Sequence, residues 1–93
     1  MSTLNFDNFK KQSLDAGFDE VLERTWTANT VVPEHTHPFS VQAVVTQGEM
    51  WMTRHGETRH LTVGGTFEMK QNEPHSERYG AEGATFWVAR RHA

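Results

Sequence analysis

The sequence predicts a small all-β barrel preceded by a short helix. Its 93 residues leave room for a single domain. From Phe18 onward, short β-branched and aromatic runs alternate with turn residues, a pattern typical of barrels and sandwiches. The preceding segment, Thr3 to Ala16, spaces its apolar residues as a helix does. We therefore expect one domain over residues 1–93, with a helix and turn in 1–17 and the barrel in 18–93.

The helical segment has signals for its start and its end. Thr3 or Asn5 can serve as the N-cap, and Gly17 follows the last apolar position as a stop. Three apolar side chains are expected to attach the helix to the barrel: Phe6, Phe9 and Leu14.

Eight runs follow that have the composition of strands. They are Phe18–Thr27, Thr30–Val32, Phe39–Gln47, Glu49–Arg54, Thr58–Val63, Thr66–Lys70, His75–Tyr79 and Thr85–Arg91. Glycine-containing breaks are expected at Gly48 and at Gly80–Gly83, and His55-Gly56 stands where a tight hairpin turn is needed.

Composition excludes several classes of function. The net charge is −3 and the basic residues are scattered, so we expect no nucleic-acid partner. The absence of cysteine removes disulfides, zinc-thiolate sites and thiol nucleophiles. No run resembles a signal peptide or reaches transmembrane length, which favours the cytoplasm and no membrane partner. Because a chain this short has a marginal core, we expect a homodimer.

Three histidines carry the main functional prediction. His35 and His37 are two residues apart, so on an extended strand both imidazoles point to the same face. An isolated pair of this kind is more often a surface feature, but His75 follows Pro74 and can add a third nitrogen from another strand. Together they predict a site for one divalent transition metal. Neutral imidazole suits Fe, Ni, Zn, Cu and Mn, so ligand type does not identify the ion.

These residues resemble the two motifs of the cupin superfamily over about half of the chain. The first motif matches His35-Thr36-His37 and the strand that reaches Gly48. The second matches the stretch from Gly65 to Pro74-His75, with Asn72 where the family usually has glycine. Asparagine tolerates the positive φ that this position requires. The resemblance implies a jelly-roll-like double-stranded β-helix with a metal held by histidines.

One element of the first motif is missing, namely its glutamate ligand. Counting back from Gly48 puts Val41 in that slot, which leaves three histidines alone. Counting forward from His37 puts Gln42 there, as a fourth ligand or a hydrogen-bond partner. Because side chains alternate along a strand, only one of the two can face the interior unless a bulge intervenes. We favour the three-histidine interpretation and keep Gln42 as a candidate ligand.

The missing carboxylate has a chemical consequence. Three neutral imidazoles leave the full +2 charge on a divalent metal, which favours a small anionic or enolisable ligand. Three-histidine cupins include dioxygenases that cleave diketones or oxidise thiols, so the resemblance implies an Fe(II)-dependent dioxygenase. The alternative is a non-catalytic module that binds or senses a small molecule. A purely structural barrel has no need for three imidazoles facing one point.

Five further residues are candidates for the substrate pocket, each with core packing as the competing interpretation: Met50, Met52, Arg54, Phe67 and Tyr79. Arg54 either anchors a ligand carboxylate, pairs with a glutamate or extends into solvent. Glu34 either orients an imidazole or is solvated. The remaining histidines are expected at the surface: His55, His60 and His92.

Overall fold

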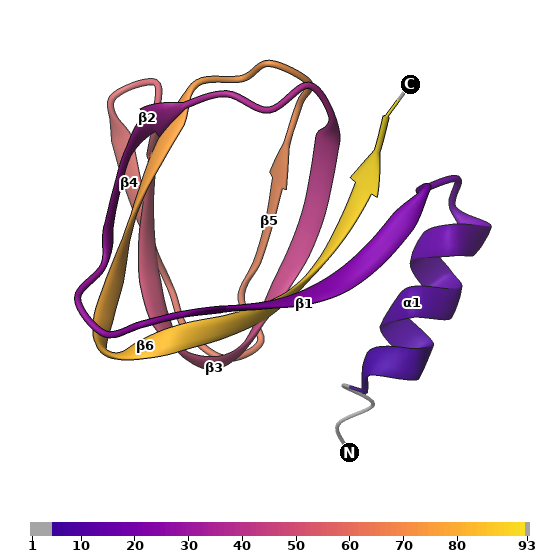
Figure 1. Ribbon diagram of the computed structural model, residues 1–93, viewed down its shortest axis with the longest axis horizontal. Helices are drawn as coiled ribbons and strands as arrows, with labels where there is room; N and C mark the ends of the chain where they lie inside the picture. The colour runs from indigo at the N-terminus through magenta and orange to yellow at the C-terminus, as the bar shows by residue number, and fades with distance from the viewer. Residues whose placement is uncertain (1–4, 93) are drawn as a thin grey trace.

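The computed structural model describes residues 5–92, which form one helix and six strands (Figure 1). The elements are α1 (Phe6–Asp15), β1 (Glu20–Trp26), β2 (Val31–His35), β3 (Ser40–Arg54), β4 (Glu57–Leu61), β5 (Thr66–Met69) and β6 (His75–Arg91). Within residues 5–92, no helix has the length and apolar character needed to cross a bilayer.

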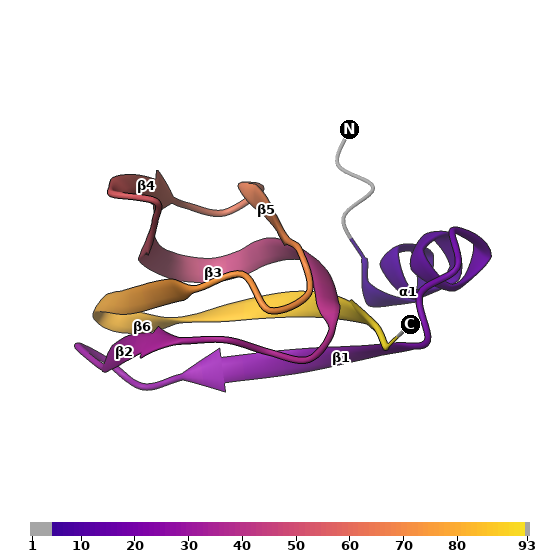
Figure 2. The ribbon, with the colours of Figure 1, turned by 90° about the horizontal axis from the view of Figure 1, so that it is seen from above.

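The six strands form one antiparallel sheet that is rolled around the two longest, β3 and β6. The first half of β3 pairs with the second half of β6, and this part of the sheet also holds β1 and β5. The second half of β3 pairs with the first half of β6, together with β2 and β4. Figure 2 shows β4 and β5 on one side of the two long strands and β1 and β2 on the other. This is the rolled architecture expected of a jelly roll.

The expected breaks at Gly48 and at Gly80–Gly83 are wrong, because β3 and β6 continue through both. Gly48 has a φ of 71° and Gly83 a φ of 73°, values that other residues rarely adopt. The pairing of β3 with β6 shifts register between Val45 and Gln47 and again between Gly48 and Met50. The glycines therefore bend the strands around the corner of the sheet, where a continuous pair can turn without ending.

This corner also reverses which side chains face inward. On β3 the positions in the core cluster change from odd (Val41, Ala43, Val45) to even (Met50, Met52). On β6 the inward-facing positions likewise change from odd (His75, Tyr79) to even (Phe86, Val88). A register shift explains the reversal, since one extra residue moves every following side chain to the opposite face. Both halves thus contribute to one core.

The helix begins and ends as expected. The side chain of Asn5 accepts a hydrogen bond from the Asn8 N–H at 2.8 Å, while the alternative cap, Thr3, lies outside the described residues. Phe6 and Phe9 both pack against Trp87, with ring centroids 5.7 and 6.0 Å apart. Leu14 was expected to join them but is 43% exposed. The two phenylalanines therefore hold α1 beside β1 and β6 (Figures 1 and 2).

Two turn predictions are confirmed. Arg54 pairs with Glu57, so His55 and Gly56 form a two-residue hairpin, with φ values of 52° and 78°. Positive φ at both positions is the requirement of a type I′ turn, which matches the twist of the strands. Asn72 has a φ of 63°, as expected for a residue that replaces glycine.

Candidate metal centre

The three predicted histidines come together at one end of the rolled sheet. His35 ends β2, His37 follows in the loop to β3, and His75 begins β6, where it pairs directly with His35. Ring centroids are 4.3 Å apart for His35 and His75, 4.8 Å for His35 and His37, and 5.1 Å for His37 and His75. One nitrogen of each ring lies within 4.8 Å of the others. The three imidazoles can therefore present their nitrogens to a single ion.

Two of the rings are held in the same tautomer by the backbone. Nδ1 of His35 lies 2.7 Å from the carbonyl oxygen of Pro33, and Nδ1 of His75 lies 2.9 Å from that of Glu73. A carbonyl oxygen only accepts, so each Nδ1 must donate. Each neutral ring then has its lone pair on Nε2, the arrangement typical of metal-bound histidine.

The environment of His75 fits a bound cation. Its side chain is 1% exposed, and its Nε2 is buried with no hydrogen-bond partner among the described residues. An unsatisfied buried acceptor costs about 1–3 kcal/mol, so such atoms are uncommon in folded proteins. A metal at this nitrogen removes the penalty.

The carboxylate of Glu77, which was not predicted from the sequence, lies beside the cluster. Oε2 of Glu77 is 3.3 Å from Nε2 of His35 and 3.6 Å from Nε2 of His75, and the glutamate side chain is 8% exposed. Because both Nε2 atoms carry lone pairs in the neutral rings, they face another acceptor. That contact is repulsive unless a cation lies there, either a proton or a metal ion. Among the described residues, the cluster that can hold an ion consists of the three histidines, and Glu77 lies beside it.

Tyr79 positions this carboxylate. Its hydroxyl donates a hydrogen bond of 2.7 Å to Oε1 of Glu77, which leaves Oε2 toward the histidines. Burial, followed by the charge of Glu77, raises the pKa of the Tyr79 phenol, so it remains a donor at neutral pH. His75, Glu77 and Tyr79 share one face of β6 because they are two residues apart. The same spacing argument that predicts the His35–His37 pair could have found Glu77.

Burial lowers the pKa of His37, and the neighbouring His35 and His75 rings lower it further. The lowered pKa keeps His37 neutral at physiological pH, which is the form that can bind a metal.

The histidines open into a cavity of about 280 Å³ inside the rolled sheet. Its walls are mostly apolar and include the rings of Phe39, Phe67 and Phe86. Two arginines that were not predicted from the sequence, Arg24 and Arg90, also line the cavity. The cavity is close to the lower end of the roughly 300–1,000 Å³ typical of small-molecule sites. It therefore has the size and shape of a pocket for a small ligand beside the histidines.

Val41 and Gln42 occupy opposite faces of β3. Val41 is 6% exposed and lines the histidine cavity, whereas Gln42 does not line that cavity and borders two other pockets. No bulge interrupts this part of β3, where Val41 pairs with Met69 and Gln42 with Glu68. The structure therefore places the amide of Gln42 away from the three histidines.

The other candidate pocket residues divide into two groups. Phe67 lines the histidine cavity. Met50 and Met52, 0% and 3% exposed, lie in the core and are not among the described residues that line it. Tyr79 is also buried, and its ring stacks on Trp26 with centroids 5.2 Å apart. Its hydroxyl group reaches the histidine cluster through the carboxylate of Glu77.

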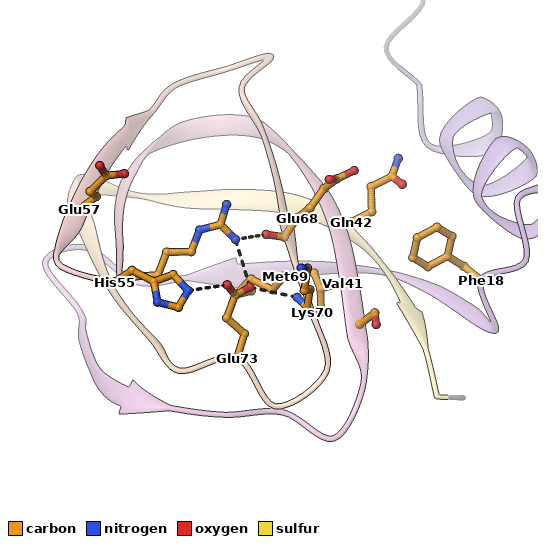
Figure 3. A pocket seen from close by; sticks show the side chains of 11 residues that line it. Phe18, Val41, Gln42, His55, Glu57, Glu68, Met69, Lys70 and Glu73 are labelled. Carbon is orange, nitrogen blue, oxygen red and sulfur yellow. Dashed lines mark hydrogen bonds and ion pairs between the residues drawn. The ribbon is translucent and has the colours of Figure 1, made fainter.

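Arg54 lines a separate and more open pocket of about 500 Å³. Figure 3 shows this pocket with His55, Glu68 and Glu73, which also line it. Nη1 of Arg54 donates to the carbonyl oxygen of Glu68 and, at 3.2 Å, to Glu73. His55 and the Lys70 N–H also bond to the Glu73 carboxylate, at 2.8 and 3.0 Å. The Lys70 N–H and His55 hold the pKa of Glu73 below its usual value. Of the three alternatives for Arg54, the structure shows the glutamate pair. Because Glu73 also bonds to His75 through its carbonyl, this network anchors the loop that precedes that histidine.

The remaining histidines are exposed, as expected: His55, His60 and His92. Glu34 is also exposed, and the carboxylate beside the imidazoles is Glu77 instead.

The rolled sheet and the histidine cluster define the chain as a cupin-type domain. The family described as the AraC-like ligand binding domain matches residues 18–92, and the chain belongs to that family. No curated protein sequence matches it.

Solved structures give the same fold. The DMSP lyase DddQ from Ruegeria pomeroyi DSS-3 superposes with a TM-score of 0.70 and 22% identity, over 76% of this chain and 36% of the lyase. The polyketide cyclase RemF from Streptomyces resistomycificus superposes with a TM-score of 0.68 and 22% identity, over 86% of this chain and 60% of the cyclase. An RmlC-like cupin from Shewanella frigidimarina NCIMB 400 superposes with a TM-score of 0.66 and 18% identity, over 75% of this chain and 63% of that cupin. The chain thus spans about a third of the lyase, and at these identities the likeness concerns the fold.

Proposed function

We propose that this cupin domain binds one divalent transition metal through His35, His37 and His75, and a small anionic ligand beside it. The observation that carries the proposal is the buried Nε2 of His75, which has no partner among the described residues while its Nδ1 is committed to a carbonyl. The converging Nε2 atom of His35 and the nearby Glu77 carboxylate support it. When bound, the metal supplies a Lewis acid that polarises and orients the ligand.

The residues of the chain divide the remaining tasks. Glu77 lowers the net charge at the centre, and Tyr79 fixes the orientation of its carboxylate. The arginines in the cavity add positive charge and can bind an anion. The apolar walls exclude water from the ligand, which strengthens these interactions. The family, whose description names ligand binding, supports a small-molecule partner.

Within this proposal, the catalytic hypothesis is an Fe(II)-dependent dioxygenase acting on an anionic or enolisable compound. The histidine donors suit Fe(II), as they also suit Ni, Zn, Mn and Cu. The alternative is a domain that binds or senses its ligand without turnover. Protein prepared anaerobically with Fe(II) and mixed with diketones, thiols and catechol-like acids separates them. Oxygen consumption above the Fe(II) blank supports the dioxygenase, whereas ligand-induced stabilisation without consumption supports the sensor.

Metal titration of tag-free protein tests the proposal itself. We expect one equivalent of Zn(II), Fe(II) or Ni(II) per chain, retained in the presence of a competing chelator. Thermal stability should rise with metal concentration, because an ion that binds only the folded state stabilises it. If none of the first-row metals binds above the level of a histidine-poor control protein, the proposal fails.

The Glu77 carboxylate is expected to contribute to metal affinity. Glu77→Gln keeps the shape of the side chain but removes its charge, so the site loses Coulomb attraction for a cation. We expect metal affinity to fall by about 10- to 100-fold, as for other groups that support metal ligands. Competition with a fluorescent chelator measures the change.

Tyr79→Phe is the matched variant, because it keeps the charge of Glu77 and removes only the hydrogen bond that orients it. It should weaken binding less than Glu77→Gln does. Equal affinities in Glu77→Gln and the wild type would show that the carboxylate has no part in the site.

A further inference from the structure

We propose that the ligand of the histidine cavity is a small carboxylate with an apolar or aromatic body, and that Arg24 and Arg90 recognise its acid group. This inference rests on the proposed small-ligand site and adds the chemical class of the ligand. It follows from three features of the cavity: an arginine without a carboxylate partner, a second arginine with a free donor, and apolar walls.

Arg24 is the first feature. It lies on the inner face of β1 with Leu22 and Trp26, and it pairs with Phe86 of β6. Ion pairs in the described part of the chain include Arg54 and Arg90 but not Arg24. Its guanidinium instead lies 5.5 Å from the centre of the Trp26 ring. A half-buried guanidinium in a mostly apolar cavity is costly when no carboxylate lies within ion-pair distance, so the position favours an anionic ligand.

Arg90 is the second feature. Its Nη1 pairs with Glu20 at 3.2 Å, and its guanidinium lies 4.7 Å from the centre of the Phe39 ring. Its Nε is buried and has no hydrogen-bond partner among residues 5–92. The indole Nε1 of Trp26, another cavity residue, is unpartnered in the same way. Both atoms are donors only, so an acceptor such as a carboxylate oxygen is what they lack.

The balance of charge also favours an anion. The charged residues that line the cavity are Arg24, Arg90 and Glu77, and Glu77 already accepts the hydrogen bond from Tyr79. A divalent metal on the histidines would add further positive charge. An anionic ligand can therefore bind without meeting uncompensated negative charge, and guanidinium groups bind carboxylates with directional hydrogen bonds.

The apolar walls of the cavity indicate the chemical character of the rest of the ligand. Phe39, Phe67 and Phe86 face the cavity together with Val88 and Met69. A sugar would bury many hydroxyl groups against these side chains without partners, at a cost of about 1–3 kcal/mol for each. A ring or short alkyl chain instead gains the apolar surface that it buries. The cavity thus favours an aromatic or alicyclic acid over a polyhydroxylated compound.

Calorimetric titration with phenylacetate, its neutral analogue phenylacetamide and L-arabinose tests the inference. We expect phenylacetate to bind at least about tenfold more tightly than phenylacetamide, and arabinose not to bind at millimolar concentration. Arg24→Gln should lower the affinity for phenylacetate by at least about tenfold without changing the affinity for phenylacetamide. Arg24→Lys, which keeps the charge, should restore part of the affinity. Arg78→Gln is the matched control, because Arg78 is exposed and stacks on Trp51 outside the cavity.

Each titration is run on Zn(II)-loaded and on chelator-treated protein, with metal content and thermal unfolding measured for every variant. Phenylacetate binding that persists without metal supports the ligand class even if the metal proposal fails. Stoichiometric metal without any preference for the acid over the amide would overturn the ligand class alone. Tighter binding of arabinose, or an Arg24→Gln variant that binds phenylacetate as the wild type does, would also overturn it.

Discussion

His75→Ala is expected to lose stoichiometric metal, with an affinity at least about 100-fold below that of the wild type. The substitution removes the most deeply buried of the three imidazoles, and the two remaining rings cannot complete a three-nitrogen site. Groups that merely support a ligand already contribute 10- to 100-fold, so loss of a ligand should cost more. At a metal concentration 100 times the wild-type Kd, the variant should also lose about 2.3–2.7 kcal/mol of metal-dependent stability.

Two other variants make the result interpretable. His37→Ala changes a half-buried ring and should lose metal without the core cavity that His75→Ala creates. His60→Ala removes an exposed histidine that pairs with Glu49, and it should bind metal as the wild type does. Elemental analysis and chelator competition, with circular dichroism to confirm folding, measure all three. Full metal occupancy in folded His75→Ala and His37→Ala would place the ion elsewhere.

Gly48→Ala is expected to destabilise the fold by about 3 kcal/mol or more, from two separate causes. Gly48 has a φ of 71°, where a side chain costs about 1–2 kcal/mol. A Cβ there would also lie 2.1 Å from the carbonyl oxygen of Gly83, a backbone atom on the partner strand. The strands must separate at the corner to relieve this clash, at a further 1–3 kcal/mol or so. Thermal unfolding should show a Tm lowered by roughly 12–24 °C.

Gly56→Ala separates the two causes. Gly56 has a similar φ of 78°, but a Cβ at that position would meet no atom within 4 Å. Its loss of stability should therefore be about 1–2 kcal/mol, from backbone conformation alone. Equal effects at the two glycines would show that the corner of the sheet has room for a side chain.

The sequence predicts local structure well where a residue type favours one conformation for one local reason. The cap at Asn5, the hairpin at His55-Gly56 and the positive φ of Asn72 all depend on neighbouring backbone, so they can be inferred from a few letters. Gly48 shows the limit of this reasoning. Glycine both ends strands and bends them, and only the pairing of β3 with β6 decides between these outcomes.

The site residues also divide into those that local sequence predicts and those that only the folded sheet brings together. The histidine cluster follows from the two-residue spacing and the cupin motifs, and Glu77 could have followed from its spacing to His75. Arg24 and Arg90 could not, because they come from β1 and from the second half of β6 and meet the site only through the rolled sheet. The choice between Val41 and Gln42 likewise depends on strand register, which motif counting left open.

The bonds that orient His35 and His75 have a consequence for how the domain tolerates mutation. In both, the acceptor is the main-chain carbonyl of the residue two positions earlier, Pro33 or Glu73. A metal centre in which an aspartate or glutamine side chain orients the imidazole can lose that hydrogen bond by a single nucleotide change. A main-chain oxygen is present whatever residue occupies the position, so no codon change deletes it. Selection can therefore vary the cavity walls and the charged residues around the ion while these two imidazoles keep their orientation.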